Sequence, residues 1–431
     1  MTLIPRLVMA SSTASLLVLA AGGADHTAFV VEASVSAERA VSDVPEAPDV
    51  SDVPDMPDEA PADAVKEAPE PTSDEKKSPA AEPAPAPTEY DFSALSPVVQ
   101  AFVDANHLNG AGLIVVHRDD GVIHQDHWGE FDADRVSLIA SSSKMITAGV
   151  LMRLDDEGLL DIDAPVADVV DWGSAHPDIT PAQLISNSSG LVGLFPNPRY
   201  GPYECQFMAA DTLQSCAETI FTTSDDDNDI VPPDSQYRYG GGQWQVAGAV
   251  AEAASGKSWA ELIDDTYVEP CDLDTLAFNN HFSQFPGQLF GYPTSFSADP
   301  SRLAATDNPN MEAGAYVTTG DYGALLLMHL RGGMCGDDQV LSNEAVDRMH
   351  TDRIGDAYGG DIWNPGLGYG LGWCIEIDSG RLIDAGAFGS VPWLDPEDGY
   401  GAYLVVEADN VIGAALAEQL YELVDRAIAG S

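Results

Sequence analysis

Ser141 and Lys144, in the run Ser141-Ser142-Ser143-Lys144, have the residue types and spacing for covalent catalysis. A separation of three places a hydroxyl and an amine on the same face of one helical turn. A serine hydroxyl becomes a good nucleophile when a base removes its proton, and a neutral lysine amine one turn away can be that base. Burial would supply the neutrality, because desolvation disfavours the ammonium form. The pair therefore predicts acyl transfer through a serine.

The context of the pair carries more information than its spacing. Ser73 and Lys76 have the same separation, but they lie in an acidic segment rich in Pro and Ala. Lys144 instead opens the run MITAGVLMRL, which is apolar almost all the way round and must be buried as a helix. A structural alternative stays open, in which Ser141 is an N-cap and Lys144 extends its amine to solvent from a helix end.

The elements that must position this pair are helices and short strands. An amphipathic helix is expected over 92–105, followed by a hairpin whose strands, 112–117 and 122–128, flank Asp119-Asp120-Gly121. The later elements are helices over 145–154, 243–254, 259–268, 319–330 and 412–428, and strands over 369–377, 381–386, 389–395 and 401–409. This order predicts an α+β fold, with an antiparallel β-sheet flanked by helices and a mostly helical second lobe.

Several motifs together resemble the superfamily of class C β-lactamases, D-alanyl-D-alanine carboxypeptidases and related esterases. The stretch SLIASSSKMITAGVLMRLDDEGLLDIDAPVADVV is similar to its Ser-x-x-Lys region, and ITPAQLISNSSGL is similar to a second motif. Tyr239 in YRYGG falls where Tyr-x-Asn belongs, and Asp384 in DAGAFG falls where Lys-Thr-Gly or His-x-Gly belongs. The resemblance runs in order over nearly all of 91–431. It implies a β-lactamase/transpeptidase-like fold.

The resemblance also implies roles for individual residues. Ser141 would be the nucleophile, with Lys144 and Tyr239 as its catalytic partners. The backbone N–H groups of Ser141 and Ala387 would form the oxyanion hole. Tyr239 could instead be an ordinary core or loop tyrosine, so its role is a hypothesis at this point.

The resemblance implies three substrate-binding positions, Gly241, Asp384 and Gly386, and the first two depart from the superfamily pattern. Gly241 replaces an Asn whose amide would orient the substrate and the lysine. Asp384 replaces a cation, so a substrate carboxylate would meet repulsion. An acid near Lys144 would also stabilise its ammonium form, and the resemblance then gives more of the base role to Tyr239. Alternatively, Asp384 only bonds backbone or caps a turn.

Charge excludes several classes of function. The 431 residues carry 70 Asp and Glu against 18 Lys and Arg, a formal charge of −52. Residues 91–431 keep 53 of the acids and 13 of the bases, so the acidity is not confined to the N-terminal segment. Such a chain cannot neutralise a phosphate backbone, which excludes a nucleic-acid partner. A polybasic lipid-binding or calmodulin-target role is excluded on the same ground.

The sequence of residues 1–90 indicates two segments that lie outside the folded domain. Residues 1–24 have one Arg before a short apolar run that ends in small residues, which is typical of a secretory signal peptide. Residues 25–90 are rich in Pro, Ala and acids and predict a disordered tether. The folded domain is then 91–431. No membrane span is expected after signal cleavage, and the protein is expected to be secreted, periplasmic or at the cell surface.

Five cysteines fit an oxidising compartment. Cys205 and Cys216 bracket a short segment and are expected to form a disulfide, whereas the pairing among Cys271, Cys335 and Cys374 stays open. None has C-x-x-C spacing, and the histidines form no helix-face ligand set, so neither a metal nor a cofactor is expected.

The sequence thus predicts a serine hydrolase that acts on an ester or amide through a Ser141 acyl-enzyme. It favours an esterase-like enzyme over a true β-lactamase. The substrate would be a small molecule or derived from the cell wall. Two alternatives stay open. One is a non-catalytic binding module that keeps the fold, and the other is a D-alanyl-D-alanine carboxypeptidase acting on peptidoglycan.

Overall fold

The computed structural model describes residues 88–195, 197–224, 229–284, 291–293, 299–355 and 366–430. The predicted signal peptide, 1–24, lies outside these ranges, as does the predicted tether, 25–90, except for its last three residues. Within the described ranges no helix is both long and apolar enough to cross a bilayer.

The larger sheet is antiparallel and has seven strands in the order β2-β1-β12-β11-β10-β9-β8. Its strands are β1 (Gly110–His117), β2 (Gly121–Gly129), β8 (Leu367–Tyr369), β9 (Cys374–Glu376), β10 (Leu382–Ile383), β11 (Ser390–Asp395) and β12 (Tyr400–Val405). The N-terminal hairpin joins the late strands through β1 and β12, which pair from Gly112 with Val405 to His117 with Tyr400. The predicted antiparallel sheet is confirmed, and the late strands complete the sheet that the first hairpin begins.

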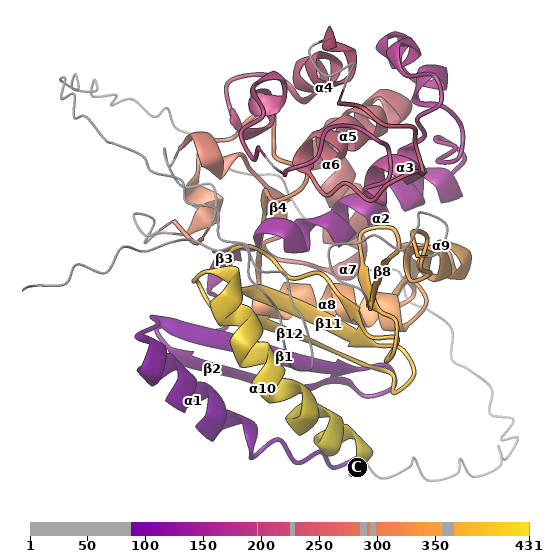
Figure 1. The fold of residues 1–431 in the computed structure, drawn as a ribbon. Helices are drawn as coiled ribbons and strands as arrows, with labels where there is room; N and C mark the ends of the chain where they lie inside the picture. The colour runs from indigo at the N-terminus through magenta and orange to yellow at the C-terminus, as the bar shows by residue number, and fades with distance from the viewer. Residues whose placement is uncertain are drawn as a thin grey trace, which may run out of the picture. The chain divides into compact units, whose positions relative to one another are not determined.

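Both faces of this sheet are buried, because alternate residues of a strand point to opposite sides. Leu113 and Val115 of β1 pack with the helices α1 (Leu95–Asn106) and α10 (Asn410–Ala429), which lie along one face (Figure 1). Ile114 and Val116 belong to the core on the other face, where α8 (Thr319–Leu330) contacts β1 and β12. The sheet is therefore a rigid layer between helices.

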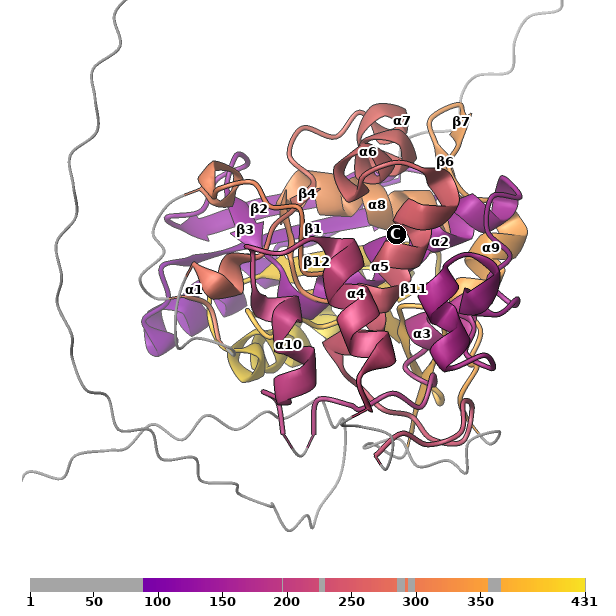
Figure 2. The same cartoon turned by 90° about the horizontal axis from the view of Figure 1, so that it is seen from above.

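The rest of the domain is mainly helical and overlies the sheet when seen from above (Figure 2). Its helices are α2 (Lys144–Asp156), α3 (Pro181–Ile185), α4 (Leu213–Thr222), α5 (Gly241–Ser255), α6 (Trp259–Ile263), α7 (Glu269–Cys271) and α9 (Asn343–Met349). Two small sheets accompany them, one of β3 (Val136–Leu138), β5 (Ala315–Thr318) and β4 (Ala277–Phe278), the other of β6 (Met334–Cys335) and β7 (Asp338–Gln339). The α+β class and the mostly helical second lobe are confirmed.

Helix α2 is buried on nearly every side, as its apolar sequence predicts. Its packing is tight at Gly149, where a Cβ atom would lie 1.9 Å from the Tyr267 hydroxyl. That hydroxyl donates to the Ile146 carbonyl of α2 at 3.0 Å. The helix that carries Lys144 is thus held in one position by its neighbours.

Two disulfides lie in the helical part. Cys205 bonds Cys216, the pairing expected from the sequence, and Cys271 bonds Cys335, which the sequence left open. Cys374 keeps a free thiol.

Candidate active site

Ser141 lies in a 3-10 turn, Ala140–Ser143, that leads from β3 into α2. Ala140 has φ +47°, a left-handed conformation that costs a non-glycine residue about 1–3 kcal/mol and clusters at functional sites. Ser141 is partly exposed, whereas Ser142 and Ser143 are buried. Ser141 is therefore the one hydroxyl of the three that a substrate can approach.

Lys144 is buried and fully engaged. Its Nζ donates to the Ser141 carbonyl at 2.6 Å and forms an ion pair with Asp384 Oδ1 at 3.0 Å. Both side chains are only 2% exposed. The interpretation of Lys144 as a side chain that reaches solvent is wrong. The amine also has a buried acid as its partner, so both of its contacts lie inside the site.

Asp384 follows β10 and reaches the start of α2. Its Oδ2 accepts a hydrogen bond from the Met145 backbone N–H at 3.3 Å, so it bonds backbone as well as Lys144. Burial raises the pKa of Asp384 to about 6, although the Lys144 ammonium acts in the opposite direction. Asp384 therefore remains ionised at neutral pH and loses its charge in mildly acidic solution.

The segment after Asp384 is fastened to the Ser141 turn by buried hydroxyls. Ser142 Oγ donates to the Asp384 carbonyl at 2.6 Å, and Ser390 Oγ donates to the Ile139 carbonyl at 2.7 Å. A Cβ atom on Gly386 would lie 2.0 Å from that Ile139 carbonyl oxygen, so this close approach requires glycine. These contacts bring residues 384–390 against the nucleophile turn.

Tyr239 meets Ser141 directly. Its hydroxyl lies 2.6 Å from Ser141 Oγ, and Lys144 Nζ lies 5.1 Å from the centre of its ring. Burial raises the pKa of Tyr239 well above its usual value of 10, and the Glu312 carboxylate adds to the rise. The hydroxyl is therefore protonated at neutral pH. Tyr239 lies at the site and is not an ordinary core tyrosine.

The loop that carries Tyr239 is anchored by backbone and amide contacts. Leu194 N–H donates to the Tyr239 carbonyl at 2.6 Å, and the Gln243 amide donates to the Arg238 carbonyl at 2.7 Å. Gln243 and Trp244 also both donate to the Asn187 side-chain oxygen. Tyr239 is thus attached to α5 and to the segment after α3.

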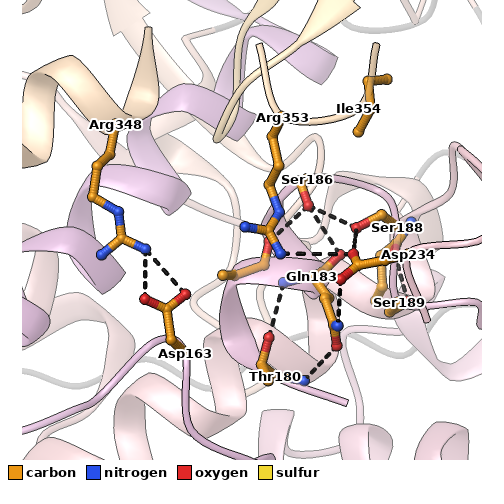
Figure 3. Close-up of polar contacts among 12 residues, drawn as sticks. Asp163, Thr180, Gln183, Ser186, Ser188, Ser189, Asp234, Arg348, Arg353 and Ile354 are labelled. Carbon is orange, nitrogen blue, oxygen red and sulfur yellow. Dashed lines mark hydrogen bonds and ion pairs between the residues drawn. The ribbon is translucent and has the colours of Figure 1, made fainter. Parts of the chain in front are cut away.

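The neighbouring 179–191 segment, which resembles the second family motif, is held by its own polar network (Figure 3). Thr180 and Gln183 form a capping box at the start of α3. Asp234 accepts hydrogen bonds from Gln183 and Ser188, and Arg353 forms an ion pair with it at 3.6 Å. This network fixes the base of the loop that leads to Tyr239.

One residue at the site was not predicted from the sequence, namely Glu312. Glu312 is only 7% exposed, and its carboxylate adds to the rise in the pKa of Tyr239. A Cβ atom on Gly241 would lie 2.5 Å from Glu312 Oε2 and 2.1 Å from Gln206 Oε1. The space beside Gly241 is therefore filled by these two side chains. The available signal was a lone acid in the otherwise uncharged run NPNMEAGAYVTTG.

The structure therefore brings Ser141, Lys144, Tyr239 and Asp384 together from three separate parts of the chain. Gly241 lies at the edge of this group, through its contact with Glu312. The oxyanion-hole role of the Ser141 and Ala387 N–H groups stays a prediction.

Comparisons with known proteins show the family and the fold. A family model described as β-lactamase matches residues 95–426. Penicillin-binding protein 4 of Amycolatopsis lactamdurans is 27% identical over 296 residues, which are 63% of this chain and 72% of that protein.

Solved structures share the fold. EstCE1, a hydrolase with promiscuous acyltransferase activity, matches with a TM-score of 0.64 at 18% identity, over 77% of this chain and 98% of that chain. An octameric penicillin-binding protein homologue from Pyrococcus abyssi matches with a TM-score of 0.57 at 21% identity, over 77% of each chain. The fold is that of the β-lactamases and transpeptidases.

Proposed function

The chain belongs to the β-lactamase family, and from that premise we propose that it is a secreted serine hydrolase that acts on neutral esters through a Ser141 acyl-enzyme. The observation that carries the proposal is the 2.6 Å contact between the partly exposed Ser141 hydroxyl and Tyr239, beside the buried Lys144–Asp384 ion pair. A nucleophile within hydrogen-bond reach of a proton-transfer partner is the arrangement that acyl transfer needs.

The reaction would have two steps. Ser141 Oγ attacks the ester carbonyl and gives its proton to the deprotonated form of Tyr239, and the alcohol departs with that proton returned by Tyr239. Water then attacks the acyl-enzyme by the same route and releases the acid. The Ser141 and Ala387 N–H groups would stabilise the oxyanion, and a donor of this kind contributes about 2.7–4 kcal/mol to the transition state.

Secretion is part of this proposal. It is supported by the signal-like N-terminus and by two disulfides, which persist outside the cytoplasm. The similarity to a penicillin-binding protein is compatible with a place in the cell envelope.

Labelling with a fluorophosphonate probe tests the nucleophile. We expect the full chain to be labelled at Ser141, as read by peptide mass spectrometry, and Ser141→Ala to be unlabelled. Ser142→Ala is the matched control and should still be labelled, because that neighbouring hydroxyl is buried and engaged with Asp384 and Ser390. Unchanged labelling of Ser141→Ala would refute the assignment. An unlabelled wild-type chain would support the non-catalytic binding module instead.

Substrate charge gives a second prediction. Asp384 and Glu312 place two buried carboxyl groups beside Ser141, so an anionic substrate should be repelled. We expect kcat/KM for p-nitrophenyl acetate or butyrate to exceed that for nitrocefin, a β-lactam with a carboxylate, by at least about 100-fold, or about 2.7 kcal/mol. The reverse preference would point to a β-lactamase or a carboxypeptidase.

A further inference from the structure

The residues that follow the second family motif form an apolar patch, which consists of Val192, Leu194 and Phe195. Val192 and Leu194 are partly exposed, and Phe195 is 57% exposed, more than any other large apolar residue in the described ranges. Scattered apolar residues are ordinary on a protein surface, whereas neighbouring ones beside a functional site indicate that an apolar group binds there. The position of the patch therefore decides what it could bind.

The patch is joined to the backbone of Tyr239. The Leu194 N–H donates to the Tyr239 carbonyl at 2.6 Å. A Cβ atom on Gly193 would lie 2.9 Å from that carbonyl oxygen, and a Cβ atom on Gly240 would lie 2.7 Å from the Leu194 nitrogen. The two segments are thus in direct backbone contact, which the two glycines permit. Phe195 is the next residue after this contact, so its Cα is about 3.8 Å from that of Leu194.

Further hydrogen bonds hold the chain before the patch to the same loop. The Arg238 guanidinium donates to the Gly190 carbonyl at 3.1 Å, and the Arg238 backbone N–H donates to the Asn187 carbonyl at 2.7 Å. The Val192 N–H donates to the Tyr203 hydroxyl at 3.4 Å. The patch therefore has a fixed position relative to Tyr239.

The chemistry of the proposed reaction places the leaving alcohol on the side of Tyr239. The Tyr239 hydroxyl contacts Ser141 Oγ at 2.6 Å, and in that reaction it returns the proton to the departing alcohol. Such a transfer requires the alcohol oxygen to lie within hydrogen-bond reach of the tyrosine. The carbonyl oxygen would instead face the N–H groups of Ser141 and Ala387. The patch is thus on the alcohol side of the ester.

We propose that this patch binds the alcohol portion of the substrate and that Phe195 determines the specificity for it. The substrate class is then esters of apolar alcohols with chains of several carbons. Contact with Phe195 would remove apolar area of both partners from water, which favours binding in proportion to that area. The inference rests on the proposed hydrolase function, and it adds a preference for a large apolar alcohol to the preference for an uncharged substrate.

Two isomeric esters test which side of the substrate the patch contacts. Hexyl acetate and ethyl hexanoate contain the same atoms, but the long chain is on the alcohol side in the first and on the acyl side in the second. Ethyl acetate is the reference, and acid release by the full chain is followed by titration at constant pH. We expect the wild-type kcat/KM for hexyl acetate to exceed that for ethyl acetate by about 10-fold or more.

Phe195→Ala should remove most of this preference. We expect kcat/KM to fall about 10-fold for hexyl acetate and at most about 2-fold for ethyl acetate and ethyl hexanoate. Phe195→Leu keeps an apolar side chain and should recover part of the loss. Because Phe195 is more than half exposed, Phe195→Ala should unfold at the wild-type temperature.

A matched control is Leu159→Ala. Leu159 is 50% exposed and lies beyond the last turn of α2, about 20 Å along that helix from Lys144. Its removal should leave the kcat/KM values of all three esters unchanged. A loss in Leu159→Ala equal to that in Phe195→Ala would show a general effect of the substitutions and contradict the assignment of Phe195.

Inhibition by 1-hexanol measures the same contact without its ester. We expect 1-hexanol to compete with ethyl acetate and its inhibition constant to rise about 10-fold in Phe195→Ala. An unchanged constant would contradict a contact between Phe195 and the alcohol.

The failure of this inference can be distinguished from the failure of the hydrolase proposal. If Phe195→Ala lost no activity on hexyl acetate, or lost as much on ethyl hexanoate, the alcohol assignment would be overturned while turnover of ethyl acetate kept the hydrolase function. Fluorophosphonate labelling at Ser141 without turnover of hexyl acetate would also overturn it. A wild-type chain with neither ester hydrolysis nor labelling would overturn both proposals.

Discussion

Replacing Lys144 with Met is expected to destabilise the folded protein by about 3–5 kcal/mol at pH 8, and by much less at pH 5. Lys144 lowers the pKa of two buried carboxyl groups, Asp384 and Glu312. Met has a similar length but no charge, so both acids would be left in a low-dielectric site without their cation. Breaking a buried pair in this way leaves an uncompensated charge, which is costly.

The pH dependence of this loss follows from the direction of the shifts. Asp384 has a pKa of about 6 in the folded protein against 3.8 in the unfolded chain, so the folded state binds its proton more tightly. This contribution favours folding in acid and is lost as the pH rises through about 6. Without Lys144 the pKa values of Asp384 and Glu312 in the folded protein both rise further, so the loss of stability extends above pH 6. Protonation at pH 5 removes the buried charge and with it most of the penalty.

Urea unfolding at pH 5 and pH 8 measures the effect, and the chain provides its own control. Lys257 is the other lysine beyond residue 90, and it forms a half-exposed ion pair with Asp265. Because solvent screens such a pair, Lys257→Met should change the unfolding midpoint little at either pH. An equal loss for Lys144→Met at both pH values would contradict the electrostatic explanation and indicate a packing defect instead.

The parts of the site that were predictable from the sequence are those encoded locally. Ser141 and Lys144 are one helical turn apart, and the apolar run behind them shows that the lysine is buried. The order of helices and strands could be predicted for the same reason, since the helical periodicity of 319–330 and the apolar run within 401–409 are properties of short windows. The actual elements there are Thr319–Leu330 and Tyr400–Val405.

The features of the site that could not be predicted from the sequence are those that depend on contacts between distant segments. The ion pair joins Lys144 to an acid 240 positions away, a contact that neither segment reveals by itself. The Glu312 carboxyl group lies beside residue 241 because Gly241 leaves room for it, a relation that no window of the sequence contains. Motif comparison marked Gly241 as a lost amide, whereas the structure places a carboxyl group in the space beside it.

The prediction of one strand over 369–377 is wrong for a similar reason. The sequence YGLGWCIEI predicts one continuous strand, but the structure has two: β8 ends at Tyr369 and β9 begins at Cys374. The chain turns between them so that Gly372, at φ +83°, can pack against the start of α2. A Cβ atom there would lie 2.8 Å from Met145 Cα and 3.0 Å from the Lys144 carbonyl oxygen. Packing against the catalytic helix overrides the local strand propensity at this point.

Replacing Tyr239 with Phe is expected to lower kcat/KM for ester hydrolysis by about 10²–10⁴-fold, with the fold retained. The change removes a single oxygen, the one that contacts Ser141 Oγ at 2.6 Å. Ser141 would then have no route for its proton through Tyr239, and the loss of this one hydrogen bond should cost about 0.5–1.5 kcal/mol in stability. Initial rates with p-nitrophenyl butyrate, together with thermal unfolding, separate the two effects.

Tyr237→Phe is the control for this substitution, because Tyr237 lies two residues earlier in the same loop and its ring packs 5.3 Å from that of Tyr369. It should retain wild-type kcat/KM. If Tyr239→Phe were equally active, the Ser141 proton would have to leave through Lys144, and the ion pair with Asp384 would then oppose catalysis. In that case neutralising the acid by Asp384→Asn should increase the rate, whereas a route through Tyr239 predicts no such gain. The two substitutions together therefore identify which side chain takes the proton.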